Sequence, residues 1–327
     1  MRRLSYCLFC TSILPVTAAS AQIARPIPYQ AVSTPAPVDS TGTSQDVPFK
    51  PDYYDRITVK VTVAGQGPYN FLVDTGADHT VISSRIAGSL KLEAAPHVQM
   101  YTIAGDQSVR TASVGSLKFS KKTLENVNAA VLEQSNLGAD GVLGIDSLRS
   151  DRVTFDFPKG LMTIVPSSKV EHREVNRDVV VVTGKLRMGR LVLTDARTGG
   201  RAVSVVVDTG SDATIANSAL RRSLSGSKLL RPLGPIVLQS VTGHTINGEL
   251  MSLERLDVGG VTIRNLNIVF AEAPIFKVLK LDERPALLLG MNAIRAFDRV
   301  SIDFANRKFR VVLPETGQSA QLMLASR

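Results

Sequence analysis

The sequence contains little cysteine and histidine. Its two cysteines, Cys7 and Cys10, both lie in the first apolar stretch of the chain. If that stretch is removed, the rest of the chain can form no disulfide, thiol nucleophile or thiolate metal site. The four histidines, which show no spacing typical of metal ligands, are His79, His97, His172 and His244. We therefore expect neither a metal ion nor a cofactor.

Long runs of one charge are also absent. The formal net charge is +9, but lysine and arginine are scattered along the chain and do not alternate with aromatic residues. A nucleic-acid-binding secreted protein would rest on net charge alone, so we expect a basic soluble surface and no nucleic-acid partner. With 327 residues and 44% hydrophobic content, the chain is long enough for one large domain or two of ordinary size.

The N-terminal segment has the layout of a secretory signal. Two arginines precede a short apolar stretch that ends in Ala19-Ser20-Ala21. A membrane anchor is a weaker interpretation because the apolar run is short and contains Pro15. The cysteines do not lie in a convincing context for a lipoprotein. We predict a signal peptide over residues 1–21, a secreted or periplasmic protein, and no stable membrane anchor after cleavage.

Three further segments have the composition of connections. Residues 22–50 are rich in proline, serine, threonine and alanine, which is typical of a flexible leader. The same segment is alternatively a strand reaching toward the body of the protein, or a propeptide that covers a cleft. Residues 167–178 are charged and poor in apolar side chains, so we predict a linker there. Residues 316–327 are interpreted as a tail.

The body of the chain is an internal repeat. Each copy has a strand and a turn, an apolar run ending in Asp-Thr-Gly, a strand pair, a further strand, an apolar-Gly element and a closing strand pair. The corresponding segments are 57–63, 71–83, 98–114, 124–132, 140–150 and 153–166 in the first copy, and 190–196, 205–217, 236–253, 263–270, 286–297 and 300–314 in the second. Short strands rich in valine, isoleucine and threonine predict an all-β architecture with little helix.

The repeated Asp-Thr-Gly is not explained by strand repetition. FLVDTGADHTVIS (71–83) and VVVDTGSDATIAN (205–217) place Asp74 and Asp208 directly after apolar runs. Aspartate is depleted from strands, and a buried carboxylate is costly unless it is paired or hydrogen-bonded. A single Asp-Thr-Gly suits an ordinary turn. Two copies, each matched downstream by an apolar-apolar-Gly element, favour a shared chemical function.

These motifs resemble those of the aspartic proteases of the pepsin and retropepsin group. The matching residues are the two stretches above and the elements Val142-Leu143-Gly144 and Leu288-Leu289-Gly290. The resemblance covers about residues 55–314 and is nearest to bacterial tandem proteins built as a fused retropepsin dimer. It implies two retropepsin-like β-barrel lobes, residues 51–166 and 179–315, related by a pseudo-twofold axis with a cleft between them. Short lobes and the absence of disulfides distinguish the chain from long pepsin-like enzymes.

The resemblance implies that Asp74 and Asp208 meet at the bottom of the cleft, share one proton and activate a water molecule. Residues expected to support this pair are Thr75, Gly76, Ala77, Thr209, Gly210 and Ser211. The glycines allow a tight turn, and the threonines are expected to form hydrogen bonds across the lobes. The Ser211 hydroxyl can donate to Asp208, whereas Ala77 has no hydroxyl. We therefore predict that Asp74 more often carries the shared proton, and that the activity optimum lies above strongly acidic pH.

Two turns occupy the place of the retropepsin flap, the hairpin that closes over substrate. The candidate substrate contacts are Tyr101, Thr102, Ile103, Ala104, Gly105, Thr242 and Gly243, the last two followed by His244. Ordinary hairpins are the alternative interpretation.

Paired charges are expected next to these elements. Asp78 and Asp212 follow the two motifs at equal spacing, and Arg149 and Arg295 follow the two apolar-Gly elements. We predict an Asp–Arg pair within each lobe, with exposed and unpaired side chains as the alternative.

The sequence as a whole predicts an exported aspartic endopeptidase that binds a peptide or protein substrate as an extended strand. A retropepsin-like binding or scaffold module that hydrolyses little is the alternative, because a fold does not prove an activity. A fused dimer completes its own site, so a monomer is expected.

Overall fold

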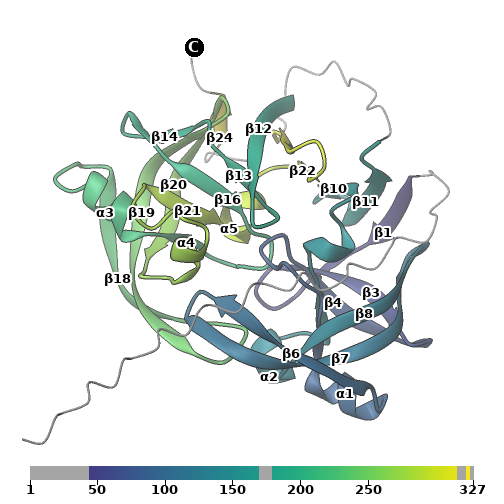
Figure 1. The fold of residues 1–327 in the computed structure, drawn as a ribbon. Coiled ribbons are helices and arrows are strands. Elements are labelled where there is room, and N and C mark those ends of the chain that lie inside the picture. Colours follow the sequence, from purple (N-terminus) through teal and green to yellow (C-terminus); the bar gives the residue numbers. More distant parts are fainter. Residues whose placement is uncertain (1–43, 169–178, 315–321, 325–327) are drawn as a thin grey trace, which may run out of the picture. The chain divides into compact units, whose positions relative to one another are not determined.

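The computed structural model describes residues 44–168, 179–314 and 322–324, and these belong to one compact unit. The predicted signal peptide lies outside the described residues, as do most of the leader, most of the linker and most of the tail. Strands make up 57% of the structure and helices 10%. The predicted all-β class with two lobes is therefore confirmed (Figure 1).

The first lobe is an eight-stranded sheet that folds back on itself, because β3 pairs with both β4 and β7. Its strands in spatial order are β2 (Lys50–Pro51), β3 (Ile57–Val63), β4 (Gln66–Val73), β9 (Gly141–Leu143), β5 (Val81–Ser83), β8 (Lys122–Leu132), β7 (Gly105–Phe119) and β6 (Glu93–Thr102). Its helical pieces are short, as the sequence predicts: α1 (Ser84–Ser89), α2 (Gln134–Leu137) and the 3₁₀ turn η1 (Ile145–Ser147).

The second lobe repeats this order of pairing. Its strands in spatial order are β13 (Arg190–Leu193), β16 (Ser204–Val207), β21 (Ala286–Leu289), β17 (Thr214–Ala216), β20 (Val261–Phe270), β19 (Thr245–Val258), β14 (Ala196–Thr198) and β15 (Arg201–Ala202). Beside these, β18 (Leu230–Gln239) pairs with β19, and β24 (Leu322–Leu324) pairs with β20. The helices are α3 (Ser218–Ser223), α4 (Ile275–Val278) and α5 (Met291–Ile294).

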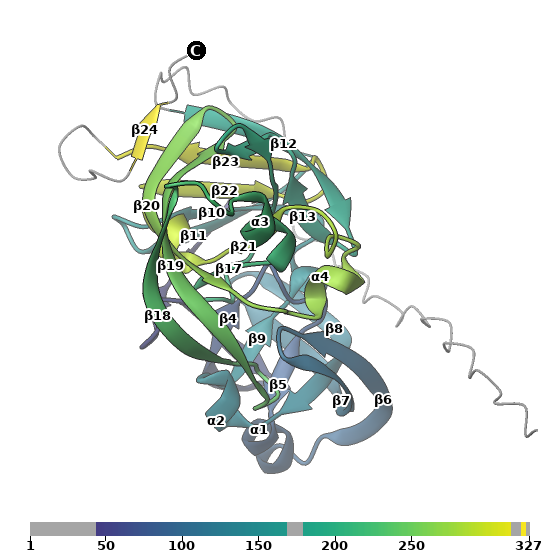
Figure 2. The same cartoon turned by 90° about the vertical axis from the view of Figure 1, so that its left-hand side faces the viewer.

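A six-stranded segment joins the lobes (Figure 2). Its order is β1 (Gln45–Pro48), β11 (Leu161–Pro166), β10 (Asp151–Asp156), β22 (Arg299–Asp303), β23 (Lys308–Val312) and β12 (Val179–Arg187). The joint is the β10–β22 pair, in which Thr154 lies opposite Ser301 and donates a hydrogen bond to it at 2.9 Å. Backbone hydrogen bonds thus connect the closing strand pairs of the two repeats.

The boundary between leader and first lobe needs a correction. Residues 45–51 fall in or beside the predicted leader, yet they form β1 and β2, and β1 pairs in register with β11. Val47 and Phe49 are buried against the core. The sequence allows three interpretations of residues 22–50. The strand reaching toward the body is the one that fits residues 45–50. The physical reason is that β1 satisfies the open edge of β11, and that Val47 in β1 and Phe49 just after it bury their side chains in the core.

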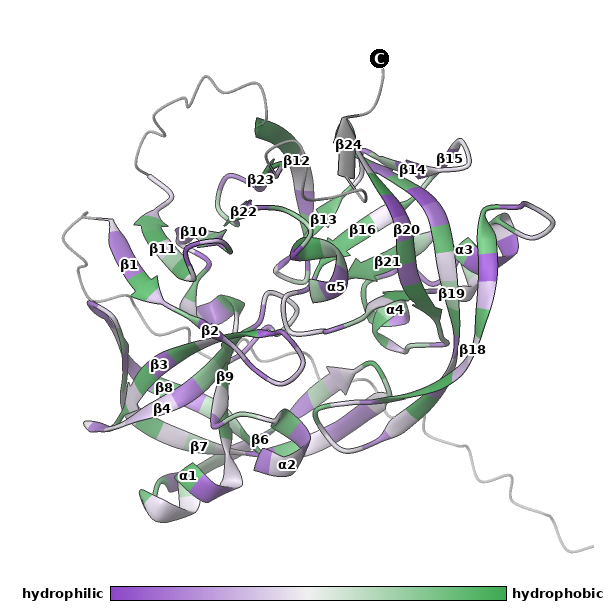
Figure 3. Cartoon of the chain, turned by 180° about the vertical axis from the view of Figure 1, so that it is seen from behind, coloured by the Kyte–Doolittle hydropathy of each residue, from purple (hydrophilic) through white to green (hydrophobic). Residues whose placement is uncertain are grey.

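The interior of both lobes follows from alternation along the strands. In β3, buried positions alternate with more exposed ones, and Figure 3 shows polar and apolar residues following one another along β19 and β20. At the joint, Phe155 and Ile302 are completely buried. Each fully buried side chain of this size contributes about 1.5–3 kcal/mol.

Candidate active site

The structure brings Asp74 and Asp208 together from two lobes. Each follows the last residue of a central strand, β4 or β16. The two carboxyl groups lie close together, and each shifts the pKa of the other. A Cβ atom added at Gly76 would lie 2.6 Å from Oδ1 of Asp208, and one at Gly210 would lie even closer to Asp74. Glycine is therefore required at both positions, because any side chain would displace the opposite carboxyl.

Parallel strand pairing explains why the apolar-Gly elements accompany the aspartates. Val73 is in register with Leu143, and Val207 with Leu289. The next N–H groups continue these ladders, with Asp74 donating to the Leu143 carbonyl at 3.0 Å and Asp208 to the Leu289 carbonyl at 3.1 Å.

The glycine of each apolar-Gly element lies beneath the loop that follows the aspartate. A Cβ at Gly144 would meet the His79 backbone at 2.6 Å, and one at Gly290 would clash with the Ala213 backbone. The second motif in each repeat thus positions the first.

Thr75 and Thr209 form the crossing hydrogen bonds that the resemblance implies. Each threonine N–H donates to the other's Oγ1 at 3.1 Å. The Thr75 hydroxyl donates to the Val207 carbonyl at 3.0 Å, and the Thr209 hydroxyl to the Val73 carbonyl at 2.7 Å. Both side chains are buried, so every bond is made without competition from water. Breaking one would leave a buried polar group unpaired, which costs about 1–3 kcal/mol.

Burial raises the pKa of both carboxyl groups, and that of Asp208 reaches about 7. Asp74 accepts hydrogen bonds from the N–H groups of Gly76 at 2.6 Å and Ala77 at 3.2 Å. Asp208 accepts one from Gly210 at 3.0 Å, and the negative charge of Asp74 raises its pKa further. The pair therefore ionises first at Asp74, while Asp208 holds the shared proton.

This assignment is the reverse of the one expected from Ala77 and Ser211. The Ser211 hydroxyl donates to the carbonyl of Ala213 at 2.8 Å, so it does not stabilise an ionised Asp208. Ala77 supports Asp74 through its backbone N–H, which every residue except proline has. Side-chain identity was therefore the wrong signal at both positions.

Arg190 is a site residue that the sequence interpretation missed. It lies at the start of β13 in the second lobe and reaches the first-lobe motif, where its Nε donates to the Gly76 carbonyl at 2.6 Å. Its Nη1 lies 2.9 Å from Oδ1 and 3.1 Å from Oδ2 of Asp78. The positive charge of Arg190 lowers the pKa of both motif aspartates, though less than burial raises it.

The predicted pairing of charges within each lobe is therefore wrong. Asp78 pairs with Arg190 of the other lobe, and Arg295 pairs with Asp55, also across the lobes, at 2.9 Å. The signal for Arg190 lies in the repeat itself, because Arg56 and Arg190 precede the two motif aspartates at the same distance in the sequence.

Asp146 and Asn292 are further support residues that were not predicted. Each accepts a hydrogen bond from the threonine that lies six residues after the motif aspartate. The Thr80 hydroxyl donates to Asp146, and the Thr214 hydroxyl donates to Asn292. In the first lobe His79 lies 3.7 Å from Asp146, and this carboxylate raises the pKa of His79. The second lobe has the neutral Asn292 at the corresponding position, so the two lobes are electrostatically unequal.

The first flap candidate is a hairpin with a two-residue turn at Ile103 and Ala104. Tyr101 is exposed, and the Thr102 hydroxyl donates to the Gly105 carbonyl within the hairpin at 2.9 Å. The Ala104 N–H donates back to that hydroxyl. Ile103 packs against the apolar cluster of the second lobe that contains Ile275. The tip of the first-lobe hairpin thus reaches the opposite lobe.

The second flap candidate joins β18 to β19. Its turn is closed by the Gly243 N–H, which donates to the Ser240 carbonyl at 2.9 Å, while Thr242 exchanges hydrogen bonds with Ser240 and His244. Val241 packs against the apolar cluster of the first lobe. Gln239 donates to Asn136 of α2 at 3.3 Å, so this hairpin also crosses to the opposite lobe.

The geometry and comparisons with known proteins agree on the class of protein. Two all-β lobes, each with an Asp-Thr-Gly at the same point of its sheet, define a two-lobed retropepsin-like protein. The model of the aspartyl protease family matches residues 59–147 and 194–293, more than half of the chain. The chain belongs to this family, and the two matches fit the internal repeat. Among curated proteins no match was found.

None of the helices in the described residues is long and apolar enough to cross a membrane. The same part of the chain contains no group of three or more His, Cys, Asp or Glu residues arranged to hold a metal ion.

Proposed function

We propose that this protein is an exported aspartic endopeptidase in which Asp74 and Asp208 hydrolyse peptide bonds. The observation that carries the proposal is the pair of adjacent carboxyls, one from each lobe, with unequal surroundings. Burial makes ionisation of each carboxyl costly, and two neighbouring carboxylates repel each other. The pair therefore favours a single shared proton. One carboxylate and one carboxylic acid side by side provide a general base and a general acid.

The unequal surroundings assign the roles. Asp74, the ionised member, takes a proton from a water molecule whose oxygen attacks the scissile carbonyl carbon. Asp208 gives its proton to the carbonyl oxygen, which produces a neutral tetrahedral diol. Asp74 then passes its proton to the departing amine nitrogen, while Asp208 recovers a proton from the diol as the C–N bond breaks. The pair returns to its starting protonation state without a covalent intermediate.

The hairpins support the choice of an extended peptide as substrate. Their tips, Ile103 and Val241, come from different lobes, and each reaches the apolar cluster of the other. A peptide lying between these hairpins and the aspartate pair would contact backbone from both lobes and be shielded from water. Export is inferred from the predicted signal peptide, residues 1–21.

The test is to express the chain from Gln22 and measure cleavage of a mixed peptide library by mass spectrometry. Asp74→Asn and Asp208→Asn should each reduce cleavage at least about 10³-fold, because each removes one of the two proton-transfer groups. Asp282→Asn, at an exposed aspartate outside the site, is the matched control and should retain activity. Melting curves should show that the variants fold. Cleavage that survives in either site variant would overturn the assignment, and a folded wild type that cleaves nothing would favour a binding module.

A further inference from the structure

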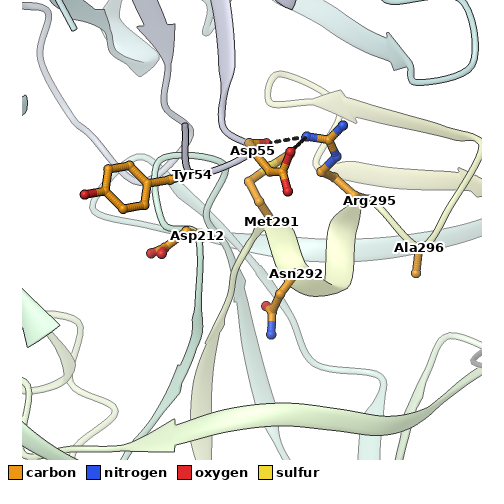
Figure 4. A pocket seen from close by; sticks show the side chains of 7 residues that line it. All are labelled: Tyr54, Asp55, Asp212, Met291, Asn292, Arg295 and Ala296. Carbon is orange, nitrogen blue, oxygen red and sulfur yellow. Dashed lines mark hydrogen bonds and ion pairs between the residues drawn. The ribbon is translucent and has the colours of Figure 1, made fainter. Parts of the chain in front are cut away.

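A second feature of the molecule is a pocket beside the second motif loop. It has a volume of about 370 Å³ and its lining residues are Tyr54, Asp55, Asp212, Met291, Asn292, Arg295 and Ala296. Its walls come from the loop before β3 in the first lobe and from α5 and the second motif loop in the second lobe. Figure 4 shows the Asp55–Arg295 ion pair on one side and the separate carboxylate of Asp212.

The internal repeat shows what fills the corresponding place in the other half. Asp212 is the counterpart of Asp78, since each lies four residues after its motif aspartate, and Arg56 is the counterpart of Arg190. Around Asp78 the guanidinium of Arg190 contacts the carboxylate and the Gly76 carbonyl. Gly189 lies close enough that a Cβ there would be 3.8 Å from Oδ1 of Asp78. That half is therefore occupied by an arginine of the chain itself.

Arg56 does not perform this role for Asp212. Its Nε donates to Asp52 at 2.8 Å and its Nη2 to the Leu137 carbonyl at 2.9 Å, both within the first lobe. The residue before it, Asp55, adopts a φ of 62° and pairs with Arg295 of the other lobe. The space that an arginine fills beside Asp78 is consequently a pocket beside Asp212.

The charges in the pocket favour a cation. Asp55 and Arg295 neutralise each other at 2.9 Å. Within the described part of the chain, the carboxylate of Asp212 forms no hydrogen bond or ion pair, which leaves one net negative charge. The ring of Tyr54 adds an aromatic face, and guanidinium groups stack on such faces; Arg56 already lies 5.3 Å from the centroid of this ring.

We propose that this pocket binds the guanidinium group of an arginine side chain in the peptide substrate, on one side of the scissile bond only. The inference rests on the proposed function for its substrate and on the repeat for its chemistry. Arg190 uses two different nitrogens for two acceptors, and a guanidinium offers such a planar set of donors whereas an ammonium does not. On the opposite side, Arg190 already neutralises Asp78 and no second arginine is accepted.

The binding arm of the test uses small probes and does not depend on cleavage. Acetyl-arginine amide and its neutral analogue acetyl-citrulline amide are titrated into the chain from Gln22, with backbone amide NMR shifts as the readout. We expect the arginine probe to bind about five- to tenfold more tightly, because Asp212 is exposed and its charge is partly screened. Asp212→Asn should remove the preference, and Asp282→Asn, which lies outside the pocket, should keep it.

The cleavage arm uses a peptide in which arginine or citrulline is placed at each successive position. We expect one position, on one side of the cleaved bond, where arginine lowers KM about five- to tenfold, and Asp212→Asn should abolish that difference. Equal binding of the two probes, or a preference that persists in Asp212→Asn, would overturn the pocket assignment. Cleavage without any arginine preference would refute the pocket and leave the protease function intact. Selective, Asp212-dependent probe binding without cleavage would refute the protease function and leave the pocket's ligand class intact.

Discussion

Arg190 of the second lobe and Asp78 of the first form an ion pair beside the first Asp-Thr-Gly loop, with Nη1 and Oδ1 2.9 Å apart. The same guanidinium donates to the Gly76 carbonyl, so one side chain ties the second lobe to the backbone turn that shapes Asp74. In the other half of the repeat, the lobes are joined by a different ion pair, Asp55–Arg295, which lies on one side of the pocket beside Asp212. The two lobes are therefore joined on both sides of the pseudo-twofold axis, but by unrelated residues.

Replacing Arg190 should destabilise the protein and, at the same time, disturb the geometry of the Asp74–Asp208 pair. Arg190→Ala leaves Asp78 and the Gly76 carbonyl without their partner, and we expect a loss of about 2–4 kcal/mol in the free energy of unfolding. Urea denaturation measures this loss. Arg295→Ala is the matched comparison, and should cost less than about 1 kcal/mol because Asp55 is largely exposed. Equal losses in the two variants would mean that Arg190 has no special role.

Activity should fall as pH rises through about 7. Burial raises the pKa of Asp208 to about 7, so above that pH the proposed general acid is lost. At low pH, protonation of Asp74 removes the base, and its pKa is also raised by burial. A kcat/KM profile should therefore be bell-shaped with a basic limb near pH 7. A profile that is flat from pH 6 to 9 would contradict the assignment.

The protonation of Asp208 should also make the stability of the protein depend on pH. Asp208 binds its proton more tightly in the folded state than in the unfolded state, so between about pH 4 and 7 the folded state holds a proton that the unfolded state has released. The free energy of unfolding should thus decrease as pH rises across this range. Asp208→Asn should flatten that slope, which thermal melts at a series of pH values would detect. An unchanged slope would show that another group dominates.

The two glycines that lie against the motif carboxyls, Gly76 and Gly210, should not tolerate replacement by alanine. Gly76→Ala or Gly210→Ala places a Cβ atom against the opposite carboxyl, and we expect a loss of about 1–3 kcal/mol in stability together with loss of cleavage. Gly115→Ala is the matched control, since its Cβ would meet nothing within 4 Å. Melting temperatures and library cleavage provide the two measurements. If Gly76→Ala retained wild-type stability and cleavage, the close approach of the lobes would be in doubt.

The second hairpin should be loosened by a change in the other lobe. Asn136→Ala on α2 removes the acceptor for Gln239 and the group that lies against Gly243. Because the hydrogen bond is exposed, we expect only a two- to fivefold faster amide exchange in the turn 240–244. Ser135→Ala, an exposed neighbour on the same helix, should leave exchange unchanged. Hydrogen exchange with mass spectrometry would distinguish the two, and identical rates would exclude the contact.

Much of the fold was accessible from the sequence because its signals are local. Alternation along β3 and the valine-rich runs before Asp74 and Asp208 depend only on neighbouring residues, so they predict strands correctly. The internal repeat added long-range information, since two equal motifs imply two equal sites in related lobes. The strand β1 was harder to place, because a short segment such as QDVP becomes a strand only when the edge of β11 is available to it.

The all-β class, the two lobes and the two Asp-Thr-Gly motifs follow from the sequence, since strand pattern and repetition can be read residue by residue. The charges that pair across the lobes, such as Arg190 and Asp78, and the carboxyl that keeps the proton follow from the folded arrangement. Both depend on electrostatics over a few ångströms between segments far apart in the chain. There, Asp74 accepts backbone hydrogen bonds from Gly76 and Ala77, whereas the Ser211 hydroxyl donates to a carbonyl and not to Asp208.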